Sequence, residues 1–242
     1  FMKAALVFAD LVTTVSPTYA SEIQYRPEFG HGMAGVLKRR TSDLFGILNG
    51  IDEEIWDPAT DTFLERGYEL KSFQRGKAAA KKALQKELGL EENKDLVLAG
   101  VVSRLDHQKG LDTLLKIAPE FLDKMQFVVL GSGDPGLTDA FGALAQAEPK
   151  RVAFRSGFDE ALAHRIYGGS DIFIMPSRFE PCGLSQMIAM RYGSLPVVTR
   201  TGGLKDTVFY NGEPKDSNGF AIDNANEGEL HSVLGHIVSL YG

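Results

Sequence analysis

The sequence predicts an α/β fold in which a parallel β-sheet is covered by helices on both faces. Two observations predict it. From residue 96 onward, short apolar segments alternate regularly with helical ones, which is the pattern of βαβ units. These segments are apolar almost without interruption, as strands are when both faces of a sheet are buried. The expected strands are Leu96–Val102, Gln126–Leu130, Arg151–Phe154, Asp171–Met175 and Leu195–Val198, with a short last strand at Phe220–Ile222.

Helices are expected before and between these strands. The segment that precedes the first strand, Phe73–Leu88, is rich in alanine and lysine, which favour helix, and Gly89 is placed to end it. The other expected helices are Leu111–Lys124, Leu137–Ala147, Glu160–Tyr167, Leu184–Tyr192 and Glu227–Leu240.

The N-terminal region, from Phe1 to Leu48, does not share this alternation. Phe1–Ala9 is short and apolar, but Asp10 follows at once without a small-residue cleavage pattern, so we expect part of a helix rather than a signal peptide. The other expected elements are strands at Leu11–Val15 and Leu44–Leu48, a helix over 18–24 that begins at Ser16-Pro17, a loop from Pro27 to Gly35 and a short basic helix at Val36–Arg40. Residues 52–72 have no clean periodicity and indicate a connecting loop. We therefore place a domain boundary at Asn49, between regions 1–48 and 49–242.

Composition excludes several classes of protein. The net charge of −6 over 242 residues argues against a general nucleic-acid or membrane-surface binder, which would carry a basic stripe. No apolar run approaches the ~18 residues that a membrane span needs. Cys182 is the only cysteine, which excludes a disulfide framework within the chain. The five histidines are scattered without zinc-ligand spacing, so we expect no metal site.

Charged residues follow two of the predicted strands. Glu180 lies in the run Ser177–Leu184 after the strand Asp171–Met175, and Arg104 and Lys109 follow the strand that ends at Val102. Ligands of open α/β sheets bind at the carboxyl ends of strands, so one acid and two cations there indicate a site for an anionic, hydroxyl-rich ligand such as a nucleotide sugar. The alternatives are a helix-entry glutamate and two solvated surface cations.

Glycines and an aromatic residue follow other strands. Gly202 and Gly203, after Thr201, could present consecutive amides to an oxyanion, although glycine pairs also mark simple tight turns. Gly183 would permit a close approach to a ligand. Phe158 could stack on a base or pack in the core, and these two interpretations stay open.

The longest motifs resemble those of bacterial glycogen synthases and plant starch synthases. The resemblance extends over essentially the whole chain. It rests on the segments Val15–Ala20, Phe29–Gly32, Leu48–Asp52, Val102–Arg104, Gln108–Leu111, Ser177–Leu184, Met190–Gly193 and Arg200–Leu204. Many related glycosyltransferases carry a second glutamate eight residues after the first, where this chain has Ile188. The glycogen and starch synthases also lack it, which supports the narrower resemblance.

The resemblance implies a GT-B fold, with two Rossmann-like lobes and a cleft between them. This chain would supply the C-terminal, nucleotide-sugar-binding lobe and the tail of the N-terminal, acceptor-binding lobe. The implied reaction is a retaining transfer of glucose from ADP-glucose to the non-reducing end of an α-1,4-glucan, without a metal or cofactor, in the bacterial cytoplasm or plastid stroma. Much of the acceptor lobe would be missing, so the fragment alone would be nearly inactive.

The resemblance also implies roles for single residues. Arg104 and Lys109 would neutralise the diphosphate, and Glu180 would hold the donor glucose and support the cationic transition state. The other implied donor contacts are Asn49, Phe158, Gly183, Thr201, Gly202, Gly203 and Leu204. Three alternatives remain: a non-catalytic nucleotide- or glucan-binding module, a relative that uses UDP-glucose, and an inert structural partner.

Overall fold

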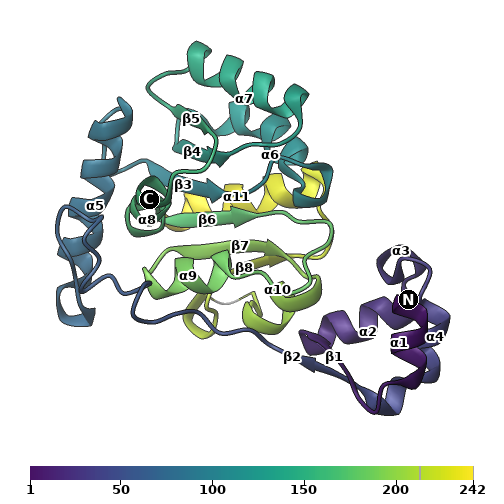
Figure 1. The fold of residues 1–242 in the computed structure, drawn as a ribbon. Coiled ribbons are helices and arrows are strands. Elements are labelled where there is room, and N and C mark those ends of the chain that lie inside the picture. Colours follow the sequence, from purple (N-terminus) through teal and green to yellow (C-terminus); the bar gives the residue numbers. More distant parts are fainter. Residues whose placement is uncertain (213, 242) are drawn as a thin grey trace.

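The computed structural model describes residues 1–212 and 214–241, and its centre is a six-stranded parallel sheet (Figure 1). The strand order is β5-β4-β3-β6-β7-β8. From the central pair β3 and β6, the chain adds β4 and β5 on one side and β7 and β8 on the other. The strands are β3 (Val97–Val102), β4 (Met125–Gly131), β5 (Val152–Ser156), β6 (Ile172–Met175), β7 (Leu195–Thr199) and β8 (Phe220–Ile222). Each lies within two residues of its predicted bounds, which confirms the predicted sheet.

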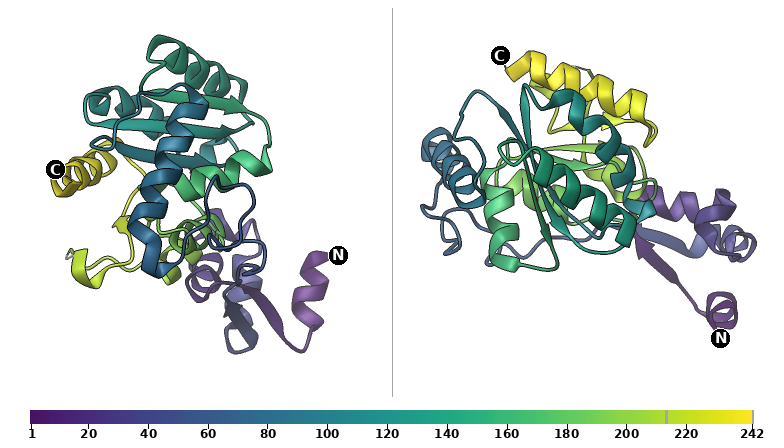
Figure 2. Two further views of the ribbon diagram at one scale, coloured as in Figure 1. Left: turned by 90° about the vertical axis from the view of Figure 1, so that its left-hand side faces the viewer. Right: turned by 90° about the horizontal axis from the view of Figure 1, so that it is seen from above.

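Helices cover both faces of the sheet (Figure 2). Alternate residues of β3 face opposite cores: Val97, Ala99 and Val101 pack into one and Leu98 into the other. The first core is closed by α6 (Leu111–Ile117), α7 (Pro135–Ala147) and α11 (Glu227–Tyr241). The opposite face is covered by α5 (Phe73–Leu88), α8 (Glu160–Gly169), α9 (Ser185–Arg191) and α10 (Gly202–Thr207). Burial on both faces explains why most residues of these strands are apolar, and the exposed end of β5 is where the polar residues Arg155 and Ser156 occur.

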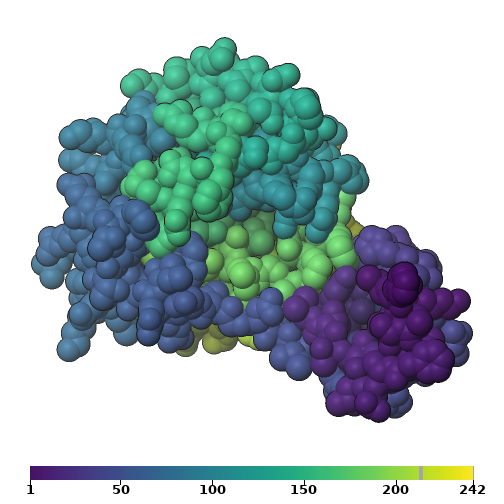
Figure 3. Space-filling view, viewed as in Figure 1, coloured from purple at the N-terminus to yellow at the C-terminus, as the bar shows by residue number. Residues whose placement is uncertain are grey.

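The N-terminal region, 1–48, forms a separate small unit beside the carboxyl edge of the sheet, drawn in purple in Figures 1 and 3. Two parallel strands, β1 (Val12–Val15) and β2 (Leu44–Ile47), pair with each other. The accompanying helices are α1 (Met2–Phe8), α2 (Pro17–Tyr25), α3 (Pro27–Gly30) and α4 (Ala34–Arg39). The unit has its own small core, and the domain boundary at Asn49 stays a prediction.

Two predicted elements differ from the structure. The helix expected over Leu111–Lys124 ends at Ile117 and continues as a 3₁₀ turn, Ala118–Phe121, because Pro119 has no N–H to donate. The loop expected from Pro27 to Gly35 contains the short helix α3, which Pro27 begins. Both differences follow from proline, which interrupts a helix when it lies in the interior and is favoured at the first position of a helix.

Candidate functional site

The strand order reverses between β3 and β6, and this position locates the site. From β3 the chain moves outward through β4 and β5, and from β6 it moves outward through β7 and β8. The loops after two such strands separate and leave a crevice, where ligands of doubly wound sheets bind. Arg104 and Lys109 lie in the loop after β3 and Glu180 in the loop after β6. The structure therefore brings together the three residues that the sequence singled out.

Lys109 and Glu180 form an ion pair across this crevice. Lys109 Nζ lies 2.5 Å from Glu180 Oε2, and the two side chains are only 17% and 9% exposed. Ser177 Oγ donates to the same carboxylate oxygen at 3.1 Å. A glutamate at an ordinary helix entry would face solvent, whereas this one is buried and paired. The alternatives of a solvated lysine and a plain helix-entry glutamate are therefore wrong for this pair.

A second set of contacts joins the two loops. Gln108 Nε2 donates to the Phe179 carbonyl at 2.9 Å, and its own backbone carbonyl accepts from the Arg178 amide at 2.8 Å. The Arg178 guanidinium binds both carboxylate oxygens of Asp112 at 2.7 and 2.8 Å, and these hydrogen bonds lower the pKa of Asp112. These contacts fix the two loops to each other and so keep the Lys109 and Glu180 side chains close together. The motifs contained Arg178, but only the fold shows its partner on α6.

A small cavity of about 200 Å³ lies between these loops. Its polar lining comes from Ser103, Arg104, Lys109, Ser177 and Ser185. Hydroxyl and cationic groups of this kind donate hydrogen bonds to phosphate and sugar oxygens. The cavity thus opens beside the ion pair and is lined by donors suited to an anion.

Gly110 allows the two loops to approach closely. Its φ is +66°, and a Cβ there would collide with the Pro176 carbonyl oxygen. The close approach in the structure is to the end of β6, so the glycine joins the two loops.

Four other predicted residues differ in their exposure to solvent. Phe158 is 89% exposed, so the core-packing interpretation is wrong for it. Arg104 is 68% exposed and pairs with Asp106 at 2.7 Å, and Asn49 is exposed beside β2. Leu204 is fully buried against Val198, Val208 and Ala221, so its side chain packs in the core, and a donor contact for this residue stays a prediction.

The predicted anion-binding turn at residues 201–203 already binds groups of the protein. The Gly202 amide donates to Glu22 Oε2 at 3.1 Å, and Thr201 Oγ1 donates to the same carboxylate. The Gly203 amide donates to the carbonyls of Glu180 and Pro181. In this structure the Gly202 amide thus binds an internal carboxylate that sequence reasoning missed, and the donor contacts of Thr201, Gly202 and Gly203 stay predictions. Glu22 belongs to α2, far away along the chain, and no local signal marks it.

Gly183 also serves an internal contact. Its φ is +70°, and a Cβ there would collide with Gln186 Oε1. Its carbonyl accepts from Gln186 Nε2 at 3.0 Å, so the glycine shapes the turn into α9. A donor contact for Gly183 stays a prediction.

Residues 1–212 and 214–241 contain neither a helix with the length and apolar character of a membrane span nor a cluster of three potential metal-ligating side chains.

Comparison with known proteins identifies the family. Residues 96–239 match the family described as "Glycosyl transferases group 1", and residues 1–39 match "Starch synthase catalytic domain". The chain belongs to the group 1 glycosyl transferases. This assignment confirms the glycosyltransferase prediction and agrees with a cationic, carboxylate-bearing crevice at the strand-order reversal.

Within this family the chain is similar to glycogen synthases. It is 49% identical to glycogen synthase of Elusimicrobium minutum over all of this chain and 50% of that protein. It is 53% identical to glycogen synthase of Anaeromyxobacter dehalogenans over 91% of this chain and 45% of that protein. The chain therefore spans about half the length of these relatives. The resemblance to glycogen and starch synthases predicted from the motifs is confirmed.

Solved structures confirm the predicted fold. The catalytic domain of starch synthase IV from Arabidopsis thaliana, bound to ADP and acarbose, superposes with a TM-score of 0.92 at 41% identity, over 99% of this chain and 50% of that chain. Sucrose-phosphate synthase from Thermosynechococcus elongatus shares the fold at a TM-score of 0.67 and 20% identity, over 99% of this chain and 52% of that chain. The parallel sheet with helices on both faces is that of a GT-B lobe.

Proposed function

We propose that this chain is the donor-binding half of a retaining glucosyltransferase that moves glucose from ADP-glucose to the non-reducing end of an α-1,4-glucan. The observation that carries the proposal is the buried Lys109–Glu180 pair at the point where the strand order reverses, with Arg104 beside it. The similarity to glycogen synthases, and to a starch synthase solved with ADP and acarbose, supports this donor and acceptor.

The cations are suited to the leaving group. Three N–H groups extend from the Lys109 ammonium, and one is used by Glu180. The other two, with the exposed guanidinium of Arg104, can neutralise charge as the bond between the anomeric carbon and the diphosphate oxygen breaks. The bond to the acceptor hydroxyl oxygen forms on the same face, and the hydroxyl proton leaves with the diphosphate. These two side chains, rather than a metal or cofactor, neutralise the charge of the leaving group.

Glu180 is suited to the sugar. Its carboxylate is held by Lys109 and Ser177 through one oxygen, Oε2. The other oxygen can accept from glucose hydroxyls and stabilise the positive charge that develops on the ring as the bond breaks. This stabilisation grows only in the transition state, so it accelerates transfer rather than merely tightening binding.

The test is incorporation of radiolabelled glucose from ADP-glucose into glycogen by the full-length polypeptide. Glu180→Gln should lower kcat by about 100-fold or more, because it removes the charge that opposes the developing cation. Glu160→Gln changes an exposed carboxylate on α8 and serves as the matched control. Normal transfer by Glu180→Gln would instead favour a binding module. Calorimetry decides the donor, since equal affinity for ADP and UDP would contradict our choice.

A further inference from the structure

Helices α2 and α10 pack against each other, and each carries a carboxylate that binds the start of the other. Glu22 of α2 accepts from the Gly202 amide at 3.1 Å and from Thr201 Oγ1 at 3.2 Å. Asp206 of α10 accepts from Ser16 Oγ at 2.5 Å and from the Thr18 amide at 3.0 Å. These reciprocal contacts connect the N-terminal region, 1–48, to the carboxyl edge of the main sheet.

Glu22 depends on these contacts. Within the described residues, neither Glu22 nor Asp206 has a lysine or arginine nitrogen within 4 Å, and Glu22 is only 8% exposed. A buried carboxylate without a counter-ion needs its hydrogen bonds, because burial otherwise costs several kcal/mol. Ser16 shows that the arrangement is demanding, since it is fully buried and held at a φ of +70°. A non-glycine residue in this region is strained, and such strain persists where surrounding contacts enforce it.

The Glu22 contact leads directly to Glu180. Gly202 is so close to Glu180 that a Cβ there would collide with the Glu180 carbonyl oxygen. The next amide, that of Gly203, donates to this carbonyl at 3.3 Å and to the Pro181 carbonyl at 3.1 Å. The turn that is hydrogen-bonded to Glu22 therefore packs directly against the backbone of Glu180.

The residue before Glu180 is held from the same side. The Phe179 ring packs on Phe29 at a centroid distance of 4.6 Å and on Tyr19 at 5.4 Å. These partners belong to α3 and α2. The backbone at positions 179 and 180 is thus positioned by the N-terminal region, through an aromatic contact and through Glu22.

We propose that Glu22 is a positioning residue for Glu180. It fills the anion position at the turn 201–203 and thereby sets where the Glu180 carboxylate meets the glucose. Glu22 does not touch the Lys109–Glu180 pair itself, so its effect is geometric. The inference rests on the proposed function, because it assigns Glu180 its role at the sugar.

Three variants of the full-length polypeptide separate geometry from charge. Glu22→Ala removes the acceptor, and Glu22→Asp withdraws it by one methylene, so both should lower kcat by about 10- to 100-fold while KM for ADP-glucose changes by less than about threefold. Glu22→Gln keeps an acceptor oxygen at the same reach and should retain most of kcat. A role that depended on charge would give the reverse order, with Asp active and Gln impaired. Glu28→Gln, an exposed glutamate on α3, should match the wild type.

The assays are run well below the unfolding temperature of each variant, so that a merely structural loss does not lower kcat. If Glu22→Ala and Glu22→Asp keep kcat within about twofold of the wild type while Glu180→Gln abolishes transfer, the inference is wrong and the proposed function stands. If the wild type itself does not transfer glucose, the proposed function fails. Amide hydrogen exchange over residues 177–204 then decides: faster exchange in Glu22→Ala but not in Glu22→Gln supports the positioning contact, and unchanged exchange overturns it.

Discussion

Two lysine–carboxylate pairs lie at opposite ends of strand β6, and they differ in how many of their hydrogen bonds are already made. Lys81 and Asp171 meet at 2.7 Å just before the strand begins, at the amino edge of the sheet. Lys109 and Glu180 meet at 2.5 Å after it ends, at the carboxyl edge. Both lysine side chains are largely buried, so burial alone does not distinguish the two pairs.

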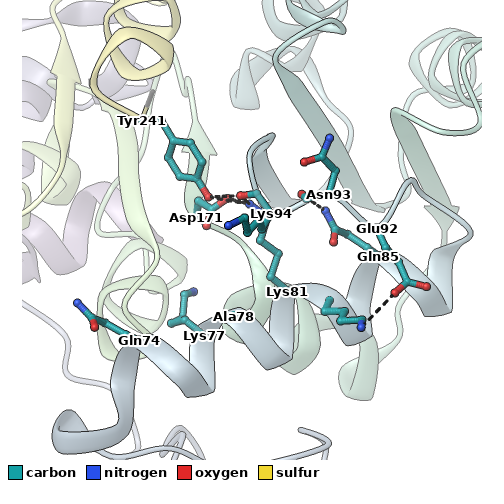
Figure 4. A pocket seen from close by; sticks show the side chains of 11 residues that line it. Gln74, Lys77, Ala78, Lys81, Gln85, Glu92, Asn93, Lys94, Asp171 and Tyr241 are labelled. Atoms are coloured by element: carbon teal, nitrogen blue, oxygen red, sulfur yellow. Dashed lines mark hydrogen bonds and ion pairs between the residues drawn. The ribbon is translucent and has the colours of Figure 1, made fainter.

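The pair at the amino edge is saturated (Figure 4). Besides Asp171, the Lys81 ammonium has three oxygens within hydrogen-bond distance, those of the Lys94 and Leu96 carbonyls and the Tyr241 hydroxyl. An ammonium has three hydrogens, so four oxygens already occupy all of them. The Leu98 amide donates to the Asp171 oxygen that Lys81 binds. The hydrogen bonds of this pair connect α5, β6 and the end of α11. The Lys81 ammonium therefore has no N–H left to donate to a ligand.

The pair at the carboxyl edge is unsaturated. In the described part of the chain, Glu180 is the one hydrogen-bond partner of the Lys109 ammonium, and only Oε2 of the Glu180 carboxylate accepts a hydrogen bond. Cavity size ranks the two ends in the opposite order, because the cavity at the amino edge is about 530 Å³ and the one between the loops of Lys109 and Ser177 about 200 Å³. Unused hydrogen-bonding capacity at a strand-order reversal is the better guide to a site.

The largest expected effect comes from breaking the saturated pair. Lys81→Met should lower the free energy of unfolding by about 3–5 kcal/mol, because Asp171 is left as a mostly buried charge without its partner. Urea denaturation measures it. Lys82→Met is the matched control, since Lys82 is 72% exposed and 3.7 Å from Glu92, and it should cost less than about 1 kcal/mol. Equal losses for the two variants would contradict the assignment of Lys81 to stability.

The next effect comes from breaking the unsaturated pair. Lys109→Met should lower kcat for glucosyl transfer by about 100-fold, or about 2.7 kcal/mol in the barrier, because the diphosphate loses a cation. Its effect on the free energy of unfolding should be smaller than that of Lys81→Met, about 2 kcal/mol, because the Lys109 ammonium has one oxygen partner where Lys81 has four, and Ser177 still donates to Glu180. Lys116→Met, on the exposed side of α6, is the control. A variant that unfolds as readily as Lys81→Met, yet transfers glucose normally, would reverse the comparison.

The carboxyl-edge side of this contrast was predictable from the sequence, because it depends on order along the chain, whereas the Lys81–Asp171 pair was not predicted. Apolar segments alternating with helices predict a parallel sheet, and the carboxyl ends of parallel strands lie at one edge. The sequence therefore predicts that Arg104, Lys109 and Glu180 lie together, and the structure confirms that they lie around one crevice. Their chemical roles rest on the family resemblance rather than on this geometry.

The rest could not be predicted, because it depends on which distant surface packs against a residue. Leu204 and Phe158 are both apolar and both follow a strand, yet one is fully buried and the other 89% exposed. The difference is made by Val208 and Ala221, which cover Leu204. The Glu22–Gly202 contact joins α2 to the start of α10 and leaves no local pattern. Such contacts have no periodicity or motif by which a single sequence could reveal them.

The smallest expected effect tests saturation itself. Tyr241→Phe removes one of the four oxygens around Lys81 but keeps the ring, which lies 5.0 Å from the ammonium. Three hydrogens shared among four oxygens can redistribute over the three that remain, so the free energy of unfolding should fall by at most about 1 kcal/mol. Tyr25→Phe, at a tyrosine that is 58% exposed, is the control for loss of a hydroxyl in urea denaturation. A loss near that of Lys81→Met would mean that the ammonium lacks a spare acceptor. The stability of the amino-edge pair would then depend on each single hydrogen bond of Lys81, as the carboxyl-edge pair depends on the one between Lys109 and Glu180. The number of unused hydrogen bonds would then no longer distinguish the two pairs.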